Sequence, residues 1–250
     1  DFQKRRFYCT CGSGTIVDVV ARLEGVDGGE AVRRLRRWLD GEAVAAPAPK
    51  PAPPPPADEP EVDLGEALEK AQAIWRRTRP ITPDSPAGAY LRARSCRLPG
   101  PGADLRWLPP SPKHPRPTMV ARVADAREAD RLMTLQLWPI SPDGSRGERR
   151  LLRGLPKRGG VVRLQDDGEV TAGLVVAEGV ETALSAPGPA WGVIDAGNLA
   201  GLPPLGGLEV LTIVADGDDA GRRAAGACAE RWRAAGAAVR IVTSGELDGT

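Results

Sequence analysis

Acidic residues follow two apolar segments in the C-terminal part of the sequence, and their types suit the binding of a divalent cation. Glu178 comes directly after the apolar run 174–177, and Asp216 and Asp218 come directly after the run 210–215. Three carboxylates that converge on one point repel each other unless a cation joins them. Mg²⁺ or Mn²⁺ suits such a set, together with water and substrate phosphates. The spacing therefore predicts a metal site, with helix capping by the same acids as the alternative.

The segments around these acids predict alternating strands and helices. Strands are expected at 174–177, 191–194, 210–215 and 239–242, and helices over 180–184 and about 220–235. Such an alternation is typical of a parallel sheet that helices cover on both faces. Ligand sites of these sheets collect beyond the carboxyl ends of the strands, which is where Glu178, Asp216 and Asp218 stand. Asp219 is expected to be the N-cap of the last helix.

The stretches 175–183 and 213–222 resemble the two motifs of the Toprim domain, which bacterial-type primases, topoisomerases and some nucleases share. The resemblance is greatest to primases of phage and plasmid type, some of which are fused to a helicase. It implies that Glu178, Asp216 and Asp218 hold the divalent metals and that Glu178 is also a general acid or base. It further implies a nucleotidyltransferase, a DNA-directed RNA polymerase of primase type that makes RNA primers on single-stranded DNA from ribonucleotides.

A basic stretch precedes the first of these motifs. Residues 146–163 include seven Lys and Arg residues against one acid. Contact with a phosphate backbone and a solvated loop explain such a stretch equally well. Segment 150–164 also resembles the part that precedes the Toprim domain in phage and plasmid primases. That resemblance implies that Arg153, Lys157 and Arg163 face nucleotide or template phosphate.

The first 42 residues predict a small module of one short strand and two helices. Cys9, Cys11 and the segment after them are similar to the second half of a primase zinc-binding domain. Two thiolates cannot complete a tetrahedral zinc site. Zinc binding through Cys9 and Cys11 therefore requires further ligands upstream, and a degenerate module without metal is the alternative.

Four parts are predicted along the chain. They are a partial zinc-binding-like module (1–42), a Pro-rich linker (43–61), a primase-like α+β region (62–165) and a Toprim catalytic domain (166–250). The predicted fold class is α/β: a Toprim-like parallel sheet with flanking helices, preceded by a small mixed α+β region and a short zinc-finger-like module. No apolar run approaches a membrane span and no signal peptide is visible, so we expect a cytoplasmic protein without a membrane partner.

Several functions stay open at the level of the sequence. His114 is the single histidine, which argues against a Ser-His-Asp hydrolase and a three-histidine zinc enzyme. The sequence holds no Walker-type loop of an NTPase motor. A Toprim metal-dependent nuclease and a non-catalytic DNA-binding replication module remain as alternatives to a primase. A replicative helicase is a further partner that the resemblance implies.

Overall fold

The computed structural model describes residues 6–9, 12–39, 63–112 and 114–243 of the 250-residue chain. The chain divides into two compact units, residues 1–59 and 60–250. The Pro-rich linker predicted at 43–61 lies outside the described residues. In the part of the chain that is described, no helix is both long and apolar enough to pass through a lipid bilayer.

The smaller unit contains two strands and two helices, β1 (Arg6–Cys9), β2 (Gly12–Thr15), α1 (Ile16–Glu24) and α2 (Gly28–Leu39). β1 and β2 pair in antiparallel fashion, with Phe7 opposite Gly14. Gly25 ends α1 in a left-handed conformation with φ of 66°, which costs glycine little. The predicted strand and both helices are confirmed. Cys11 and the side chain of Cys9 lie outside the described residues, so the zinc site stays a prediction.

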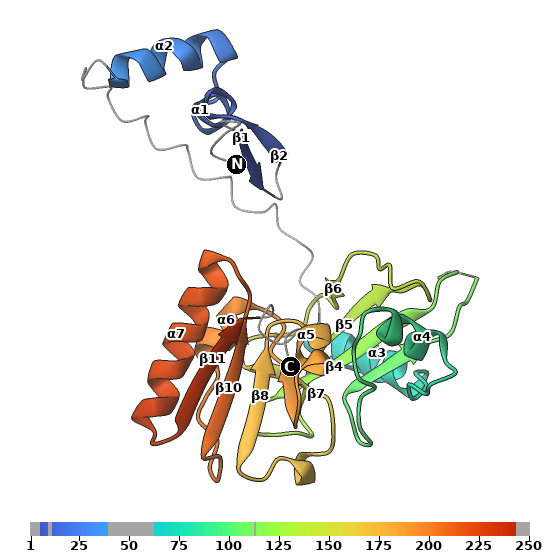
Figure 1. Ribbon diagram of the computed structural model, residues 1–250. Coiled ribbons are helices and arrows are strands. Elements are labelled where there is room, and N and C mark those ends of the chain that lie inside the picture. The colour runs from blue at the N-terminus through green and yellow to red at the C-terminus, as the bar shows by residue number, and fades with distance from the viewer. Residues whose placement is uncertain (1–5, 10–11, 40–62, 113, 244–250) are drawn as a thin grey trace. The chain divides into compact units, whose positions relative to one another are not determined.

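The larger unit alternates strands and helices along the chain (Figure 1). Its helices are α3 (Leu64–Arg76), α4 (Pro86–Ala93), the 3₁₀ turn η1 (Asp167–Glu169), α5 (Val180–Ser185), α6 (Ala196–Gly201) and α7 (Asp219–Ala234). Its strands are β3 (Leu105–Leu108), β4 (Thr118–Asp125), β5 (Leu132–Pro139), β6 (Arg150–Leu151), β7 (Gly160–Arg163), β8 (Gly173–Ala177), β9 (Ala190–Gly192), β10 (Val210–Ala215) and β11 (Ala238–Thr243).

Within residues 63–112 and 114–243, nine strands form one sheet in the order β11-β10-β8-β9-β7-β4-β5-β6, with β3 paired to β4. The strands β9, β8, β10 and β11 are parallel, which confirms the predicted parallel sheet with flanking helices. β7 runs antiparallel between β9 and β4. The sheet therefore continues across residue 165, where the sequence predicted a boundary between two domains.

Alternate side chains of the parallel strands face two different layers of helices. Leu174 and Val176 of β8 point to one side, where they belong to the same core cluster as Trp232 of α7. Ala177 points to the other side and shares a core cluster with Leu184 of α5. Successive residues of a strand face opposite sides of a sheet, so both faces are buried here. Polar groups are left to gather at the strand ends.

The first helix of this unit covers a third part of the core. Asp63 caps α3 by accepting hydrogen bonds from the backbone N–H groups of Gly65 and Glu66, at 2.7 and 3.1 Å. Ala71 of α3 packs on Val120 of β4 and Leu135 of β5. α3 therefore covers the strands β4 and β5 on this side of the sheet.

Candidate active site

The three predicted acids stand at one edge of the parallel sheet. Ala177, the last residue of β8, lies opposite Val214 in the neighbouring strand β10. Glu178 follows Ala177 directly, and Asp216 follows Ala215, the last residue of β10. Since the two strands are parallel and in this register, their C-terminal ends deliver Glu178 and Asp216 to the same place.

Asp218 has a structural role in addition to its place in this group. It is the N-cap of α7, and its Oδ1 accepts a hydrogen bond from the backbone N–H of Gly221 at 2.7 Å. The prediction that Asp219 caps this helix is wrong: Asp219 is the first helical residue and forms an ion pair with Arg222. The reason is the extended backbone of Asp218, with ψ of 170°, which brings its carboxylate over the N–H three residues on.

Glu178 carries a carboxylate that forms no ion pair with the described residues. Its Oε1 is buried and, among the described residues, has no hydrogen-bond partner. Burial raises the pKa of Glu178 above its ordinary value, and the negative charges of Asp216, Asp218 and Asp195 raise it further. A carboxylate with these surroundings is destabilised in its ionised form and favours either a proton or a cation.

Asp195 is a fourth acid of this group, and the sequence analysis missed it. It follows β9 as the N-cap of α6, where its Oδ1 accepts a hydrogen bond from Asn198 N–H at 2.8 Å. The preceding residue, Ile194, has φ of 64°. That conformation is rare for a β-branched side chain, and such strain gathers at functional sites. The available signal was an acid directly after the strand predicted at 191–194, the pattern that identified the other acids.

Lys157 lies beside this acidic group. Its Nζ is 2.9 Å from Oδ2 of Asp195, and its side chain is 54% exposed. The buried Asn198 fixes the turn that carries Lys157: its Nδ2 donates to the carbonyl oxygens of Lys157 and Gly160 at 2.8 and 3.0 Å. Its Oδ1 accepts from Gly159 N–H at 3.1 Å. The turn therefore holds one ammonium group at the acids, and phosphate binding by Lys157 stays a prediction.

The two predicted arginines have different surroundings. Arg153 is exposed in the segment between β6 and β7. Arg163 is 5% exposed: its Nε pairs with Asp167 at 2.9 Å, its Nη2 donates to the carbonyl oxygen of Asp125 at 3.0 Å, and its guanidinium lies over the ring of Trp191. Arg163 thus ties β7 to its neighbours. The sequence did not indicate that this part of the basic stretch is a buried strand.

A buried glutamate links the two halves of the larger unit. Glu181, in the first turn of α5, accepts a hydrogen bond from the hydroxyl of Tyr90 in α4 at 2.7 Å. It also forms an ion pair with Arg149, and Nε of Arg146 lies at 4.0 Å. Burial and then the bond to Glu181 raise the pKa of Tyr90. The arrangement anchors α5, which starts two residues after Glu178.

The donors at the strand ends match a hard divalent cation in kind. Carboxylate oxygens are the ligands that Mg²⁺ and Mn²⁺ prefer, and the carboxyl group of Glu178 interacts with the negative charges of three neighbouring aspartates. Within the described ranges, however, no group of three or more His, Cys, Asp or Glu side chains is arranged to hold a metal ion. Glu178, Asp216 and Asp218 are near enough to interact by charge, and their assignment as ligands stays a prediction.

Two family models match the sequence. Residues 173–248 match the model described as the Toprim domain, and residues 65–164 match that of a domain of unknown function (DUF7146). A search of curated proteins finds no match.

Three solved structures have backbones that are partly similar to the backbone of this chain. The Aquifex aeolicus primase, with its zinc-binding and RNA polymerase domains, has a TM-score of 0.42 at 17% identity, over 96% of this chain and 67% of that one. The primase fragment of the bacteriophage T7 primase-helicase protein has a TM-score of 0.40 at 14% identity, over 77% and 73%. A DNA primase domain from Pseudomonas aeruginosa has a TM-score of 0.37 at 14% identity, over 72% and 69%. At these values the likeness carries no argument about activity.

Proposed function

We propose that the protein makes RNA primers on single-stranded DNA by metal-dependent nucleotidyl transfer, starting from the match of residues 173–248 to the model of the Toprim domain. The proposal makes it a DNA-directed RNA polymerase of primase type, with ribonucleoside triphosphates as substrates. Its template-binding and catalytic parts would both lie in the larger unit. A replicative helicase stays a predicted partner.

One observation carries this proposal: the uncompensated carboxylate charge at the ends of β8 and β10. Glu178 has a buried oxygen that meets no hydrogen-bond partner in the described part of the chain, and it interacts by charge with Asp216 and Asp218. A purely structural acid at such a place would be paired, because an unpaired buried charge costs stability. A group of this kind supports a binding site for a cation and its phosphate ligand.

The acidic and basic residues of the site would have different roles in nucleotidyl transfer. Glu178, Asp216 and Asp218 would hold Mg²⁺ or Mn²⁺, which when bound stabilises the charge of the reacting phosphate and of the leaving pyrophosphate. Glu178 would also act as the general acid or base, as the resemblance to the Toprim motifs implies. Lys157 and Arg153 would neutralise the charge of the triphosphate or the template.

A priming assay tests the function directly. The full chain is incubated with single-stranded DNA, ribonucleotides and Mg²⁺, and its products are compared with those of Asp216→Asn and Asp219→Asn. We expect primers from the wild type and from Asp219→Asn. Asp219 is an exposed acid in the first turn of α7, and in the described residues it pairs only with Arg222. Asp216→Asn should lose at least about 100-fold in rate.

The products also separate the competing functions. Shortened DNA in place of primers would identify a metal-dependent nuclease. DNA binding without any metal-dependent product would identify a non-catalytic module. Equal rates for Asp216→Asn and the wild type would refute the assignment of the acids.

Metal binding has a readout that needs no activity. Saturating Mg²⁺ or Mn²⁺ should raise the midpoint of thermal unfolding of the wild type, since a ligand that binds only the folded state stabilises it. Asp219→Asn should show the same rise, and Asp216→Asn a smaller one. Identical rises in all three proteins would place the ion elsewhere.

A further inference from the structure

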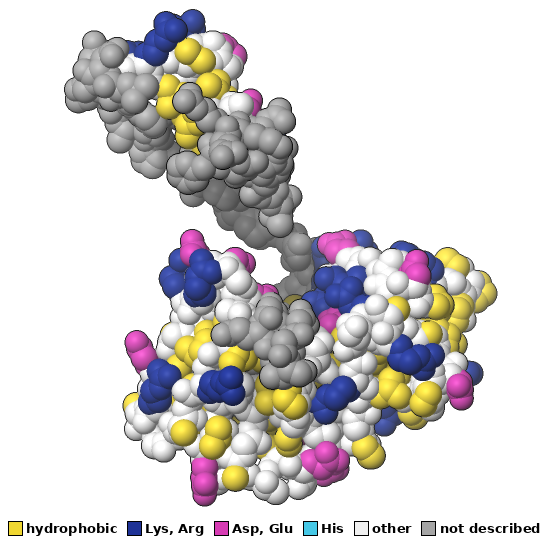
Figure 2. Space-filling view, viewed as in Figure 1, with side chains coloured by type: hydrophobic (Ala, Val, Ile, Leu, Met, Phe, Trp, Pro, Cys, Tyr) yellow, Lys and Arg dark blue, Asp and Glu magenta, His cyan; other side chains and the backbone are white. Residues whose placement is uncertain are grey.

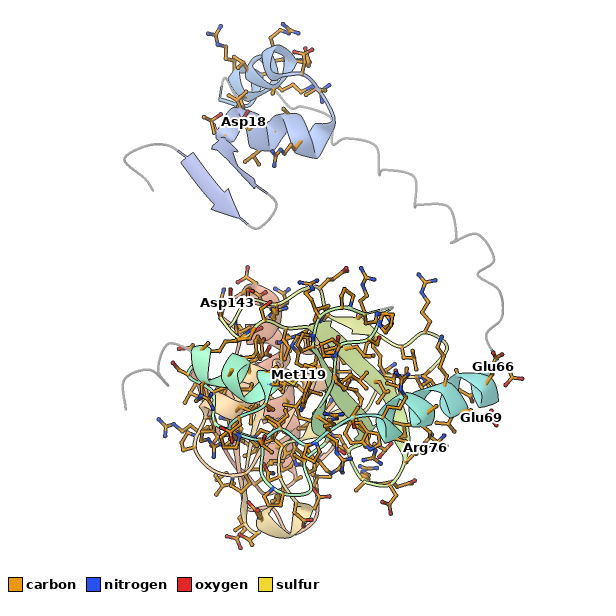
Figure 3. The ribbon with its side chains drawn as sticks, turned by 90° about the vertical axis from the view of Figure 1, so that its right-hand side faces the viewer. Asp18, Glu66, Glu69, Arg76, Met119 and Asp143 are labelled. Carbon is orange, nitrogen blue, oxygen red and sulfur yellow. The ribbon has the colours of Figure 1, made fainter. Side chains whose placement is uncertain are left out.

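A cleft of about 480 Å³ lies on the other side of the larger unit's sheet from Glu181. It is built from the end of α3, the segment between β3 and β4, and the strands β5 and β6. Figure 3 looks onto α3, whose last residue, the labelled Arg76, directly precedes the cleft residue Arg77. Of the predicted site residues whose side chains are described, none lines it. We call it the arginine cleft, after three of its residues, Arg77, Arg116 and Arg150.

The floor of the arginine cleft is apolar and partly exposed. Ile74 from α3, Leu108 from β3 and Leu137 from β5 line it, and each is half-buried. Leu137 and Trp138 are consecutive in β5, so they face opposite sides of the sheet. Trp138 is fully buried in the main core, whereas Leu137 is left at the cleft. Apolar surface that is concave and in contact with water gains free energy when a flat apolar group covers it.

The rim of the cleft is cationic. Among the described residues that line it, Arg77, Arg116 and Arg150 stand against a single acid, Glu148. Glu148 is already used, because its Oε2 pairs with Nη2 of Arg150 at 2.9 Å. In the described ranges, neither Arg77 nor Arg116 makes an ion pair. Figure 2 shows Lys and Arg side chains gathered where β6 lies in Figure 1.

Arg149 and Arg150 show how the chain separates the cleft from the acidic site. Arg149 points into the unit, where it pairs with Glu181 and lies over the ring of Trp138 at 5.2 Å. Arg150, the next residue, lines the cleft. The sheet therefore stands between the arginine cleft and α5.

We propose that the arginine cleft binds one nucleotide unit of single-stranded DNA, with the base against Leu108 and Leu137 and the flanking phosphates at Arg77 and Arg116. The combination of a flat apolar group and an anion is characteristic of nucleotides. Proteins bind single strands through a basic groove with side chains against the faces of the bases, and here the aliphatic side chains of the floor would take that place. The volume lies in the range of small-molecule sites. The inference rests on the proposed function and gives residues 65–164 a part in it.

A continuous strand fits the cleft better than a free nucleotide does. The three arginines come from three separate elements: Arg77 follows α3, Arg116 precedes β4 and Arg150 begins β6. Phosphates on both sides of one base can use cations from different elements, whereas a mononucleotide offers a single phosphate group. The cleft therefore suits a DNA strand that passes over the edge of the β-sheet.

Binding is measured by fluorescence anisotropy of a labelled oligonucleotide of about ten nucleotides, with chelator present and ribonucleotides absent. We expect Arg77→Ala and Arg116→Ala to weaken binding about tenfold each at low salt and to reduce the salt dependence by about one counterion. The matched control is Arg240→Ala, an exposed arginine in β11 at the opposite end of the sheet order; it should bind as the wild type does. Wild-type affinity in both cleft variants overturns the proposal.

Two competitors test what occupies the cleft without any change to the protein. An oligonucleotide with abasic positions should compete about tenfold less well than the intact strand, since its bases cannot reach the floor. A deoxynucleoside monophosphate should compete only at far higher concentration. Equal competition by the abasic strand refutes base contact, and competition by the monophosphate at the level of the strand identifies a free-nucleotide site instead.

The outcome is independent of catalysis. Asp216→Asn should bind the oligonucleotide as tightly as the wild type, because the chelator removes any metal contribution. If the cleft variants lose binding while the wild type makes no primers, the cleft stands and the proposed function fails. If the wild type makes primers and the cleft variants bind normally, the proposed function stands and the cleft proposal fails.

Discussion

Glu178 and Glu181 belong to the same strand–helix connection but have opposite surroundings. Glu178 directly follows β8, and it has a buried oxygen without a partner among the described residues and three acids nearby. Glu181 is 5% exposed and is joined to Tyr90 and Arg149. The carboxylate of Glu178 is available to a ligand, whereas the carboxylate of Glu181 is already paired within the protein. The difference shows a division of roles: Glu181 holds α5 in place through Tyr90 and Arg149, and Glu178 stands just before this fixed helix.

The largest expected effect separates the two glutamates by activity. Glu178→Gln should lower primer synthesis at least about 100-fold, because the variant can neither take a proton nor bind a cation with full charge. Its free energy of unfolding should not fall. Initial rates and denaturant unfolding of the same preparation check both halves of this expectation. A loss of activity that is matched by a loss of stability would make Glu178 a structural residue.

The next effect concerns stability, for which Glu181 should matter more than Glu178. Glu181→Ala should lower the free energy of unfolding by about 3 kcal/mol, because it leaves the partly buried Arg149 without its partner. Glu178→Ala should cost far less. Urea unfolding measures both variants. Similar losses for the two would remove the contrast between an open and a closed carboxylate.

The bond from Tyr90 to Glu181 should contribute a smaller part of the same effect. Tyr90→Phe should cost about 1 kcal/mol. In the Glu181→Ala background that cost should nearly vanish, since the hydroxyl has already lost its acceptor. Additive losses in the double variant would show that the two residues act independently.

The smallest effect is the dependence of stability on pH. The pKa of Glu178 is raised in the folded state, so the folded protein holds this proton more tightly than the unfolded chain does. The contribution of Glu178 is fully present below its ordinary pKa and is lost as the pH rises through the folded value. Glu178→Gln should therefore be more stable than the wild type at neutral pH. The difference should disappear at about pH 4, and an unchanged difference between the two pH values would contradict the open-carboxylate interpretation.

Local pattern was enough to predict most elements of the larger unit. Apolar runs at 174–177 and 210–215 gave two adjacent strands, and the acids after them were placed at one sheet edge because parallel strands end together. The position of the helix cap was wrong by one residue. Capping depends on the backbone angles of Asp218, which the residue types alone do not decide.

The sequence determined by itself the alternation of strands and helices, the acids that follow the strands, and the Toprim motifs, because each depends on residues close together along the chain. Only the tertiary structure decided that Arg163 is an internal tie, that Asp195 joins the acids, and that Glu181 meets Tyr90, ninety-one positions away. Those outcomes depend on which faces of distant elements come together. A charged side chain has the same identity in a phosphate site and in a buried pair, and only its neighbours in space distinguish the two.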